Sequence, residues 1–174
     1  MRFTLWNKAI QPQSGNASIT SDPHVTVARF ELGRRGEALA IEYLERAGYR
    51  IVAANLSVPV GRNTRDAIVN AEIDIVAYDG PTLCFIEVKT RESDEFAPPQ
   101  VNVDLHKRRQ IARAARGYRN MLGLSGAPYR YDVVSVVSPP SVKPDNDQPR
   151  IELLKNFWTD EQLRKRRWYD ARWD

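Results

Sequence analysis

The sequence predicts an α/β domain in which a central mixed sheet is flanked by helices. Residues 71–78 and 83–90 are rich in β-branched and aromatic residues and are separated by turn formers, which is typical of a β-hairpin. Apolar residues around 30–47 and 103–122 recur instead at helical spacing. Because both faces of the hairpin strands carry apolar residues, we expect these strands at the centre of the sheet, covered on both sides.

The first half of the chain contains one helix and one strand before this hairpin. Residues 1–27 show no sustained period and are interpreted as an irregular N-terminal extension. A helix is expected from Phe30 and should end at Gly48. A strand over 49–55 follows, and then a polar loop over 56–70, which is longer than most connections in compact domains.

The second half adds another helix and two strands. Asp104 lies near the start of the second helix, and Thr159 with Gln162 forms a capping box before a last helix. The domain therefore spans 28–157, and residues 158–174 form a basic, aromatic C-terminal tail. The other elements expected here are a helix (103–123), a strand (129–137), a polar linker (139–149) and a short strand (151–154).

Composition narrows the class of protein. The chain has 174 residues, of which 42% are apolar and 28% charged, which is ordinary for a globular protein. Its single cysteine, Cys84, excludes an internal disulfide, and with only two histidines a Cys/His zinc site is not expected. No apolar run reaches membrane-spanning length, and the N-terminus lacks the core of a secretory signal. These features favour the cytoplasm.

The hairpin carries an unusual pair of carboxylates. Side chains alternate faces along a strand, so a four-residue loop over 79–82 places Asp74 opposite Glu87 and Glu72 opposite Lys89. Directly opposed Cβ atoms lie about 5 Å apart, so the two carboxylates should repel each other. A divalent cation such as Mg²⁺ would compensate. The alternative is a solvated hairpin face that carries ordinary charges.

Basic residues are placed to meet a polyanion. The formal net charge is +4, which favours a nucleic-acid partner. Arg109, Arg113 and Arg116 form one row on the second helix, and this row either tracks a phosphate backbone or is a solvated face. Lys107 lies nearer the buried side of that helix, close to the cleft. Arg62, in the polar loop, either reaches a phosphate or is solvated.

Two further features have two interpretations each. Glu37 borders the buried stripe of the first helix and could point toward the sheet, although helix propensity alone favours a solvent-facing glutamate. Residues 164–173 mix cations with aromatic rings, which suits stacking on single-stranded bases. A terminal helix that docks its Trp side chains on the domain would explain the same composition.

The ordered set of motifs resembles the PD-(D/E)XK nuclease superfamily, whose core is the restriction-endonuclease-like fold. More narrowly, the chain resembles the YraN-like family, small bacterial proteins similar to archaeal Holliday junction resolvases. The resemblance spans roughly residues 30–157. Its matching stretches are Gly33–Glu37, Tyr43-Leu44, Gly48-Tyr49, Asn55, Glu72–Ala77, Phe85–Arg91, Lys107 and Arg130–Val134.

This resemblance implies roles for individual residues. It implies that Asp74 and Glu87 bind Mg²⁺ or Mn²⁺, that Lys89 orients the attacking water and steadies the phosphate, and that Glu37 adds a carboxylate from the first helix. Arg91, at the end of the Glu-x-Lys stretch, joins the expected nucleic-acid contacts. The implied activity is hydrolysis of phosphodiesters in branched or structured DNA, by a homodimer. The rival hypothesis is a DNA-binding or partner-recruiting module that keeps the fold without turnover.

Overall fold

The chain forms one five-stranded mixed sheet with helices on both faces. The computed structural model describes residues 23–92, 103–137 and 148–163. The strands lie in chain order across the sheet, and neighbours are antiparallel except β3 and β4, which are parallel. The predicted α/β class is therefore confirmed. The elements are α1 (Pro23–Arg46), β1 (Arg50–Arg62), β2 (Ile68–Asp79), β3 (Thr82–Arg91), α2 (Leu105–Met121), β4 (Tyr129–Val137), β5 (Arg150–Trp158) and α3 (Asp160–Leu163).

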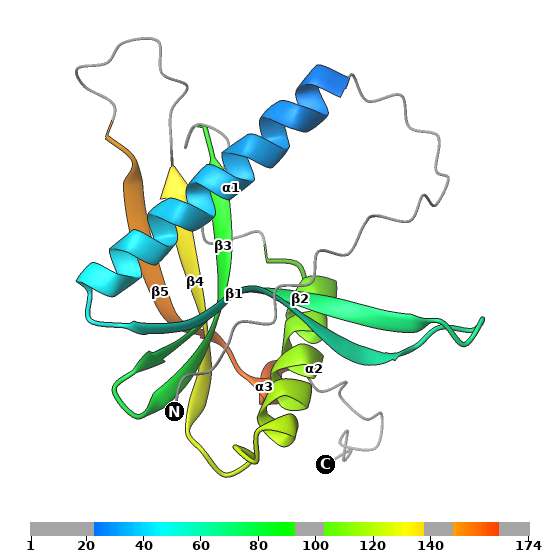
Figure 1. Ribbon diagram of the computed structural model, residues 1–174. Helices are drawn as coiled ribbons and strands as arrows, with labels where there is room; N and C mark the ends of the chain where they lie inside the picture. Colours follow the sequence, from blue (N-terminus) through cyan, green and yellow to red (C-terminus); the bar gives the residue numbers. More distant parts are fainter. Residues whose placement is uncertain (1–22, 93–102, 138–147, 164–174) are drawn as a thin grey trace, which may run out of the picture.

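The two long helices cover opposite faces of the sheet (Figure 1). Ala40 and Leu44 of α1 pack in one apolar cluster, together with Cys84 and Ile86 of β3. The intervening residue, Phe85, points to the other face and packs in the cluster that α2 covers. This alternation is why the sequence of β3 is apolar at every position in its middle.

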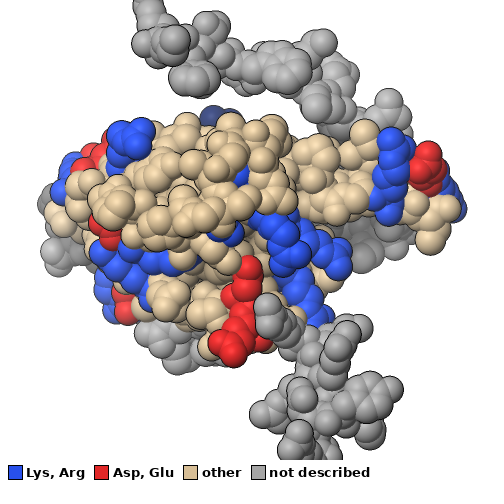
Figure 2. Space-filling model, turned by 90° about the horizontal axis from the view of Figure 1, so that it is seen from below, with Lys and Arg blue, Asp and Glu red and all other residues tan. Residues whose placement is uncertain are grey.

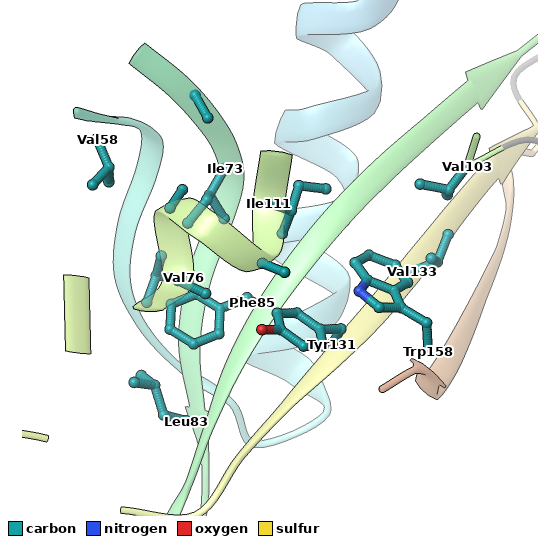
Figure 3. Packing of buried hydrophobic residues seen from close by; sticks show 14 residues of the cluster. Val58, Ile73, Val76, Leu83, Phe85, Val103, Ile111, Tyr131, Val133 and Trp158 are labelled. Atoms are coloured by element: carbon teal, nitrogen blue, oxygen red, sulfur yellow. The ribbon is translucent and has the colours of Figure 1, made fainter. Parts of the chain in front are cut away.

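Aromatic rings fill the core beneath α2. Figure 3 shows Phe85, Tyr131 and Trp158 lying along neighbouring strands with Ile111 of the helix above them. The ring of Tyr131 stacks on that of Trp158 with centroids 5.1 Å apart, and the rings of Phe85 and Tyr131 are 6.1 Å apart. Large rings that are buried and offset from one another contribute packing energy beyond their area.

Helix α2 begins where the sequence predicts. The side chain of Asp104 accepts a hydrogen bond from the backbone N–H of Lys107 at 2.8 Å, which caps the first turn. Ile111, Ala114 and Ala115 are fully buried against the sheet. The cap and the apolar stripe together fix the rotation of this helix, and therefore which of its cations faces the sheet.

The β2–β3 hairpin has the predicted register. Tyr78 pairs with Leu83 and Asp79 with Thr82, so the connection is Gly80-Pro81, with Gly80 at φ 57°. A positive φ at this turn position favours glycine because it has no Cβ. Regular pairing stops at Ile75 and Ile86. The strands separate beyond this pair, so the predicted Glu72–Lys89 pair does not form in the ladder.

The predicted loop over 56–70 is wrong for most of its length. β1 continues to Arg62 and β2 starts at Ile68, so the two strands form an arm that projects from the domain (Figure 1). In the turn, the side-chain oxygen of Asn63 accepts from the backbone N–H groups of Arg65 and Ala67. Residues 61–70 are exposed, so polar side chains occur on both faces of the arm and the alternation that indicates a strand is missing.

Smaller differences affect the ends of other elements. α1 begins at Pro23, inside the segment predicted to be irregular, and proline suits the first turn of a helix because the N–H it lacks has no helical partner there. β5 runs from Arg150 to Trp158, longer than the predicted 151–154. The predicted capping box is confirmed, since Thr159 and Gln162 exchange side-chain to backbone hydrogen bonds. The basic aromatic stretch 164–173 lies outside the described residues.

Candidate active site

Asp74 and Glu87 lie together where β2 and β3 separate. They occupy the positions next to the last ladder pair, Ile75 and Ile86, on the face covered by α2. The Asp74 side chain is 15% exposed and that of Glu87 is 2% exposed. One oxygen of Asp74 accepts a hydrogen bond from the backbone N–H of Val88 at 2.8 Å. This bond spans the opening between the strands and holds the carboxylate beside Glu87.

Two lysines reach this carboxylate pair from different elements. Nζ of Lys89, on β3, donates to Oε1 of Glu87 at 2.8 Å. Nζ of Lys107, in the first turn of α2, lies 3.2 Å from Oε2 of Glu87 and 3.9 Å from Oδ1 of Asp74. The predicted position of Lys107 near the cleft is confirmed. Both lysine side chains are more than a quarter exposed, so their ammonium groups border solvent.

Burial and like charge perturb the acids of this site. Burial and, second, the negative charge of Glu87 raise the pKa of Asp74 to about 7, against the opposing effects of the Val88 N–H and the Lys107 ammonium. Burial acts to lower the pKa of Lys107, but the carboxylates of Glu87 and Asp74 outweigh it and the pKa is raised. The Asp74 carboxyl therefore holds a proton near neutral pH in part of the molecules, and a metal ion could replace that proton.

The donor set fits a hard divalent cation. Oε2 of Glu87 is buried and makes no hydrogen bond with any described residue, because the Lys107 ammonium lies at ion-pair distance without hydrogen-bond geometry. The ion pair with Lys107 offsets part of the cost of burying this oxygen, and a metal ion between the carboxylates would coordinate it directly. Mg²⁺ is commonly held by one or two carboxylates together with water and substrate phosphates, so the Asp74–Glu87 pair is sufficient for it.

Glu37 approaches from the opposite face of the sheet. Its Oε2 accepts a hydrogen bond from Nδ2 of Asn55 at 3.0 Å. It also lines a groove of about 390 Å³ together with Lys89 and Thr90. Within residues 23–92, 103–137 and 148–163, no three His, Cys, Asp or Glu side chains are close enough to share a metal ion. The structure therefore places Glu37 beside Lys89 without adding it to the Asp74–Glu87 pair.

Apart from Lys107, the predicted nucleic-acid contacts fall into three places. Arg109, Arg113 and Arg116 line a groove of about 520 Å³ between α2 and α3. Arg62 lies on the projecting arm, whose tip carries basic and acidic side chains at the right of Figure 2, and it pairs with Asp66 at 3.2 Å. Six residues at about 3.3 Å each place this part of the arm roughly 20 Å along β2 from Asp74. Arg91 ends β3, two residues beyond Lys89.

A second charged cluster, which the sequence interpretation missed, lies near the hairpin turn. Nε of Arg130 donates to both carboxylate oxygens of the fully buried Asp132, and its Nη2 donates to Asp79 and to the Tyr49 hydroxyl. Lys155 also donates to Asp79. Arg130 and Asp132 are two residues apart on one strand and share a face, a signal that could have indicated their pairing. The contacts join β2, β4 and β5 with Tyr49, which directly precedes β1, and are structural.

The fold and the site together define an α/β protein with a core of the restriction-endonuclease type. The family model of the uncharacterised protein family UPF0102 matches residues 36–136. The chain is 41% identical over 136 residues to a UPF0102 protein from Chlorobium limicola, an alignment that covers 78% of this chain and 91% of the relative. A UPF0102 protein from Desulfosudis oleivorans is 41% identical over 128 residues, which cover 74% of this chain and 89% of the relative. The chain belongs to UPF0102, which is the YraN-like family that its motifs resemble.

This family is part of the nuclease superfamily, so membership supports a nuclease-like protein. The names of these two relatives state neither a substrate nor a cofactor. In the described part of the chain, no helix is both long and apolar enough to cross a bilayer.

Proposed function

We propose that this chain is a metal-dependent, endonuclease-like protein that hydrolyses phosphodiesters in branched or structured DNA. The observation that carries the proposal is the buried Asp74–Glu87 pair, with two lysines in contact with it and one carboxylate oxygen without a hydrogen bond. Carboxylates attract a metal but repel DNA, whereas ammonium groups attract phosphate. A site that combines both suits the hydrolysis of a phosphodiester.

Asp74 and Glu87 would hold Mg²⁺ or Mn²⁺. When bound, such an ion lowers the pKa of water and offsets the charge that develops on phosphorus. Burial prepares Glu87 for this role, because its side chain is 2% exposed and little water competes for its oxygens. The Val88 N–H fixes one oxygen of Asp74 and leaves the other directed toward Lys107.

The lysines would act on the phosphate and on the attacking water. Lys89 is anchored by Glu87 at 2.8 Å and borders the groove that also contains Glu37. Its ammonium adds positive potential where the transition state is most negative, and it can orient a water molecule at the mouth of this groove. Glu37, which is hydrogen-bonded to Asn55, is proposed to supply a further carboxylate to the hydrated ion from the α1 side.

The remaining contacts would bind the DNA backbone around the cut. Lys107 is proposed to contact the phosphate nearest the carboxylates, because its ammonium lies between them and solvent. Arg91 follows Lys89 along β3, and Arg62 would meet DNA only where the substrate reaches the projecting arm. A homodimer would bring two such sites to one branched substrate, and the mass in solution, measured by light scattering, tests this.

The direct test is metal-dependent cleavage. Junction, flap and single-stranded DNA are incubated with Mg²⁺ or Mn²⁺ and with the wild type, Asp74→Ala or Asp66→Ala. Asp66 is an exposed acid at the tip of the arm, so its replacement controls for a change in net charge. The wild type and Asp66→Ala should cut at least one substrate, and Asp74→Ala should cut none. Absence of cleavage by the wild type on all three substrates would refute an active nuclease.

One observation favours a second candidate function. Lys89 and Lys107 already pair with the carboxylates, so the site has its own counter-charge without a metal. A DNA-binding or partner-recruiting module that keeps the fold without turnover is consistent with this. Such a module would bind DNA in a salt-dependent way that Glu87→Ala leaves unchanged, and titration calorimetry would detect no Mg²⁺ or Mn²⁺ site. A third possibility is an RNA-directed nuclease. A competition assay between DNA and RNA substrates distinguishes it from a DNA-directed nuclease.

A further inference from the structure

A basic groove between α2 and α3 lies apart from the carboxylate pair. It has a volume of about 520 Å³, and its wall includes His106, Arg109, Arg113, Arg116, Asp160 and Leu163. On the face shown in Figure 2, Lys and Arg side chains gather near the centre, next to a group of acidic side chains. A groove of this size is large enough for a phosphate group and part of its sugar.

The three arginines of this groove have no ion-pair or hydrogen-bond partner among the described residues. Other arginines of the same helix do have partners. Nε of Arg108 donates to the carbonyl of Val103, and Nη2 of Arg119 donates to the carbonyl of Ser125. Arginines that line one groove repel one another, and an anionic ligand such as a phosphate would relieve this repulsion.

The acid in the groove does not cancel this charge. Both carboxylate oxygens of Asp160 accept hydrogen bonds from tyrosine hydroxyls, Tyr129 at 2.8 Å and Tyr131 at 2.9 Å. These bonds direct Asp160 toward the sheet and fix α3 against it. The arginines outnumber this carboxylate, and guanidinium groups bind phosphate oxygens in a bidentate manner.

The groove lies on the far side of α2 from the carboxylate pair. At about 100° per residue, Arg109, Arg113 and Arg116 are rotated by roughly 120° to 180° from Lys107. Lys107 faces Glu87, so the arginines face away from it. An α-helix with its side chains is about 10–12 Å across, so a phosphate in the groove and one at Lys107 cannot be the same group.

We propose that this groove is a second phosphate-binding site, which holds a backbone segment of nucleic acid other than the segment at the carboxylate pair. This proposal rests on the proposed function in one respect, namely that the ligand is a nucleic acid. It requires neither a bound metal nor cleavage. A nucleic acid that engages both places must pass around α2. The site therefore selects substrates that extend beyond the segment being cut, and it gives affinity without touching the reacting atoms.

The test is salt-dependent binding in the presence of EDTA. Fluorescence anisotropy gives the affinity of a long DNA duplex and of an RNA duplex over a range of salt concentrations, for the wild type and for the double variant Arg113→Gln with Arg116→Gln. Each lost phosphate contact lowers the slope of log affinity against log salt by about 0.9, so the double variant should lose about 1.8. Its affinity at low salt should fall roughly tenfold, which is about 1.4 kcal/mol.

A matched control removes the same formal charge elsewhere. Arg35 and Arg46 are exposed on α1, across the sheet from α2, and Arg46 forms an exposed pair with Glu42. The variant Arg35→Gln with Arg46→Gln should keep the wild-type slope to within about 0.5. The melting temperature of both variants should match the wild type, because the replaced side chains have no buried partner among residues 23–92, 103–137 and 148–163.

Several outcomes would overturn the proposal. They are an unchanged slope in the groove variant, an equal loss in the α1 control, or no binding of either duplex by the wild type. Tighter binding of poly-glutamate than of duplex, lost in the groove variant, would assign the groove to an acidic protein instead. Failure of this proposal is distinguishable from failure of the proposed function. Cleavage with an unchanged slope refutes only the groove, and a reduced slope without cleavage refutes only the nuclease.

Discussion

The replacement Asp74→Asn should stabilise the metal-free protein above neutral pH. In the wild type, burial and the charge of Glu87 raise the pKa of Asp74 from 3.8 to about 7. A group whose pKa is raised by folding stabilises the fold while it is protonated, and this stability is lost as pH rises through the folded-state value. Ionised Asp74 therefore works against the fold at pH 8, and asparagine removes that ionisation.

The structure gives the size of the effect. A shift from 3.8 to about 7 at about 1.4 kcal/mol per pH unit corresponds to about 4 kcal/mol at most. Asparagine keeps an oxygen that can accept from the Val88 N–H, but it loses the attraction to Lys107. We therefore expect a net gain of roughly 1–3 kcal/mol at about pH 8, which declines toward zero at about pH 4.

Urea denaturation in EDTA, repeated between about pH 4 and pH 8, measures this difference in the free energy of unfolding. Asp79→Asn is the control of opposite sign, because hydrogen bonds from Arg130 and Lys155 lower the pKa of Asp79 to about 2. That variant should be destabilised by a nearly constant amount between about pH 4 and pH 8, because its cost shrinks only as pH falls from 3.8 toward 2. The reasoning is refuted if Asp74→Asn differs from the wild type by the same amount at both ends of the range.

Three other replacements test separate parts of the structure. Lys107→Met should raise the affinity for Mn²⁺ roughly tenfold in titration calorimetry, because the ammonium that competes with the metal for Asp74 and Glu87 is gone. Weaker Mn²⁺ binding by this variant would show that Lys107 does not compete with the metal. Gly36→Ala should lower the free energy of unfolding by roughly 1–3 kcal/mol, since a Cβ there would lie 1.8 Å from Oγ1 of Thr90. Gly33→Ala is the control, because its Cβ would meet no atom within 4 Å, and it should be neutral or stabilising. Asp132→Asn should lower the free energy of unfolding, measured by urea denaturation, by roughly 3 kcal/mol, because it leaves the charge of Arg130 without its buried partner. A change below about 1 kcal/mol would show that the ion pair with Asp79 alone compensates the charge of Arg130.

The carboxylate pair could be predicted from sequence because its geometry is local. An even number of residues separates Asp74 from Glu87, and a short turn with Gly80 fixes the register, so alternation alone places both acids on one face. Sequence could not show that pairing stops at Ile75 and Ile86. The end of the ladder depends on β1, which leaves with β2 as the arm, and on α2, whose Lys107 enters the space between the strands.

The arm itself was not predictable from hydrophobic pattern. Periodicity marks a strand only when one of its faces is buried, and Ile68 and Val69 are 61% and 37% exposed at the start of β2. The turn between the strands was visible in principle. Asn63 and Asp66 are turn residues, and Asp66 adopts a positive φ of 61°, but a polar hairpin of this kind has the same composition as a loop.

Helical spacing in the sequence predicts the position of Lys107 but not that of Glu37. Lys107 was placed correctly because Ile111 and Ala114 define the buried side of α2 and Asp104 fixes its first residue. Glu37 has no such local reference, since its position depends on where α1 crosses the sheet. That crossing allows the close contact of Gly36 with Thr90, where any larger residue would force the helix or the Thr90 side chain to shift.

The Gly36 contact gives α1 a role in the site beyond covering the sheet. Thr90 follows Lys89 directly, so the close approach of the helix to β3 also positions the groove shared by Lys89 and Glu37. A larger residue at 36 would move Glu37 and the groove wall together, while Asp74 and Glu87 would keep their places on the hairpin. Gly36→Ala should therefore weaken cleavage more than it weakens Mn²⁺ binding, and equal losses of both would show that Glu37 belongs with the other two carboxylates as a metal ligand.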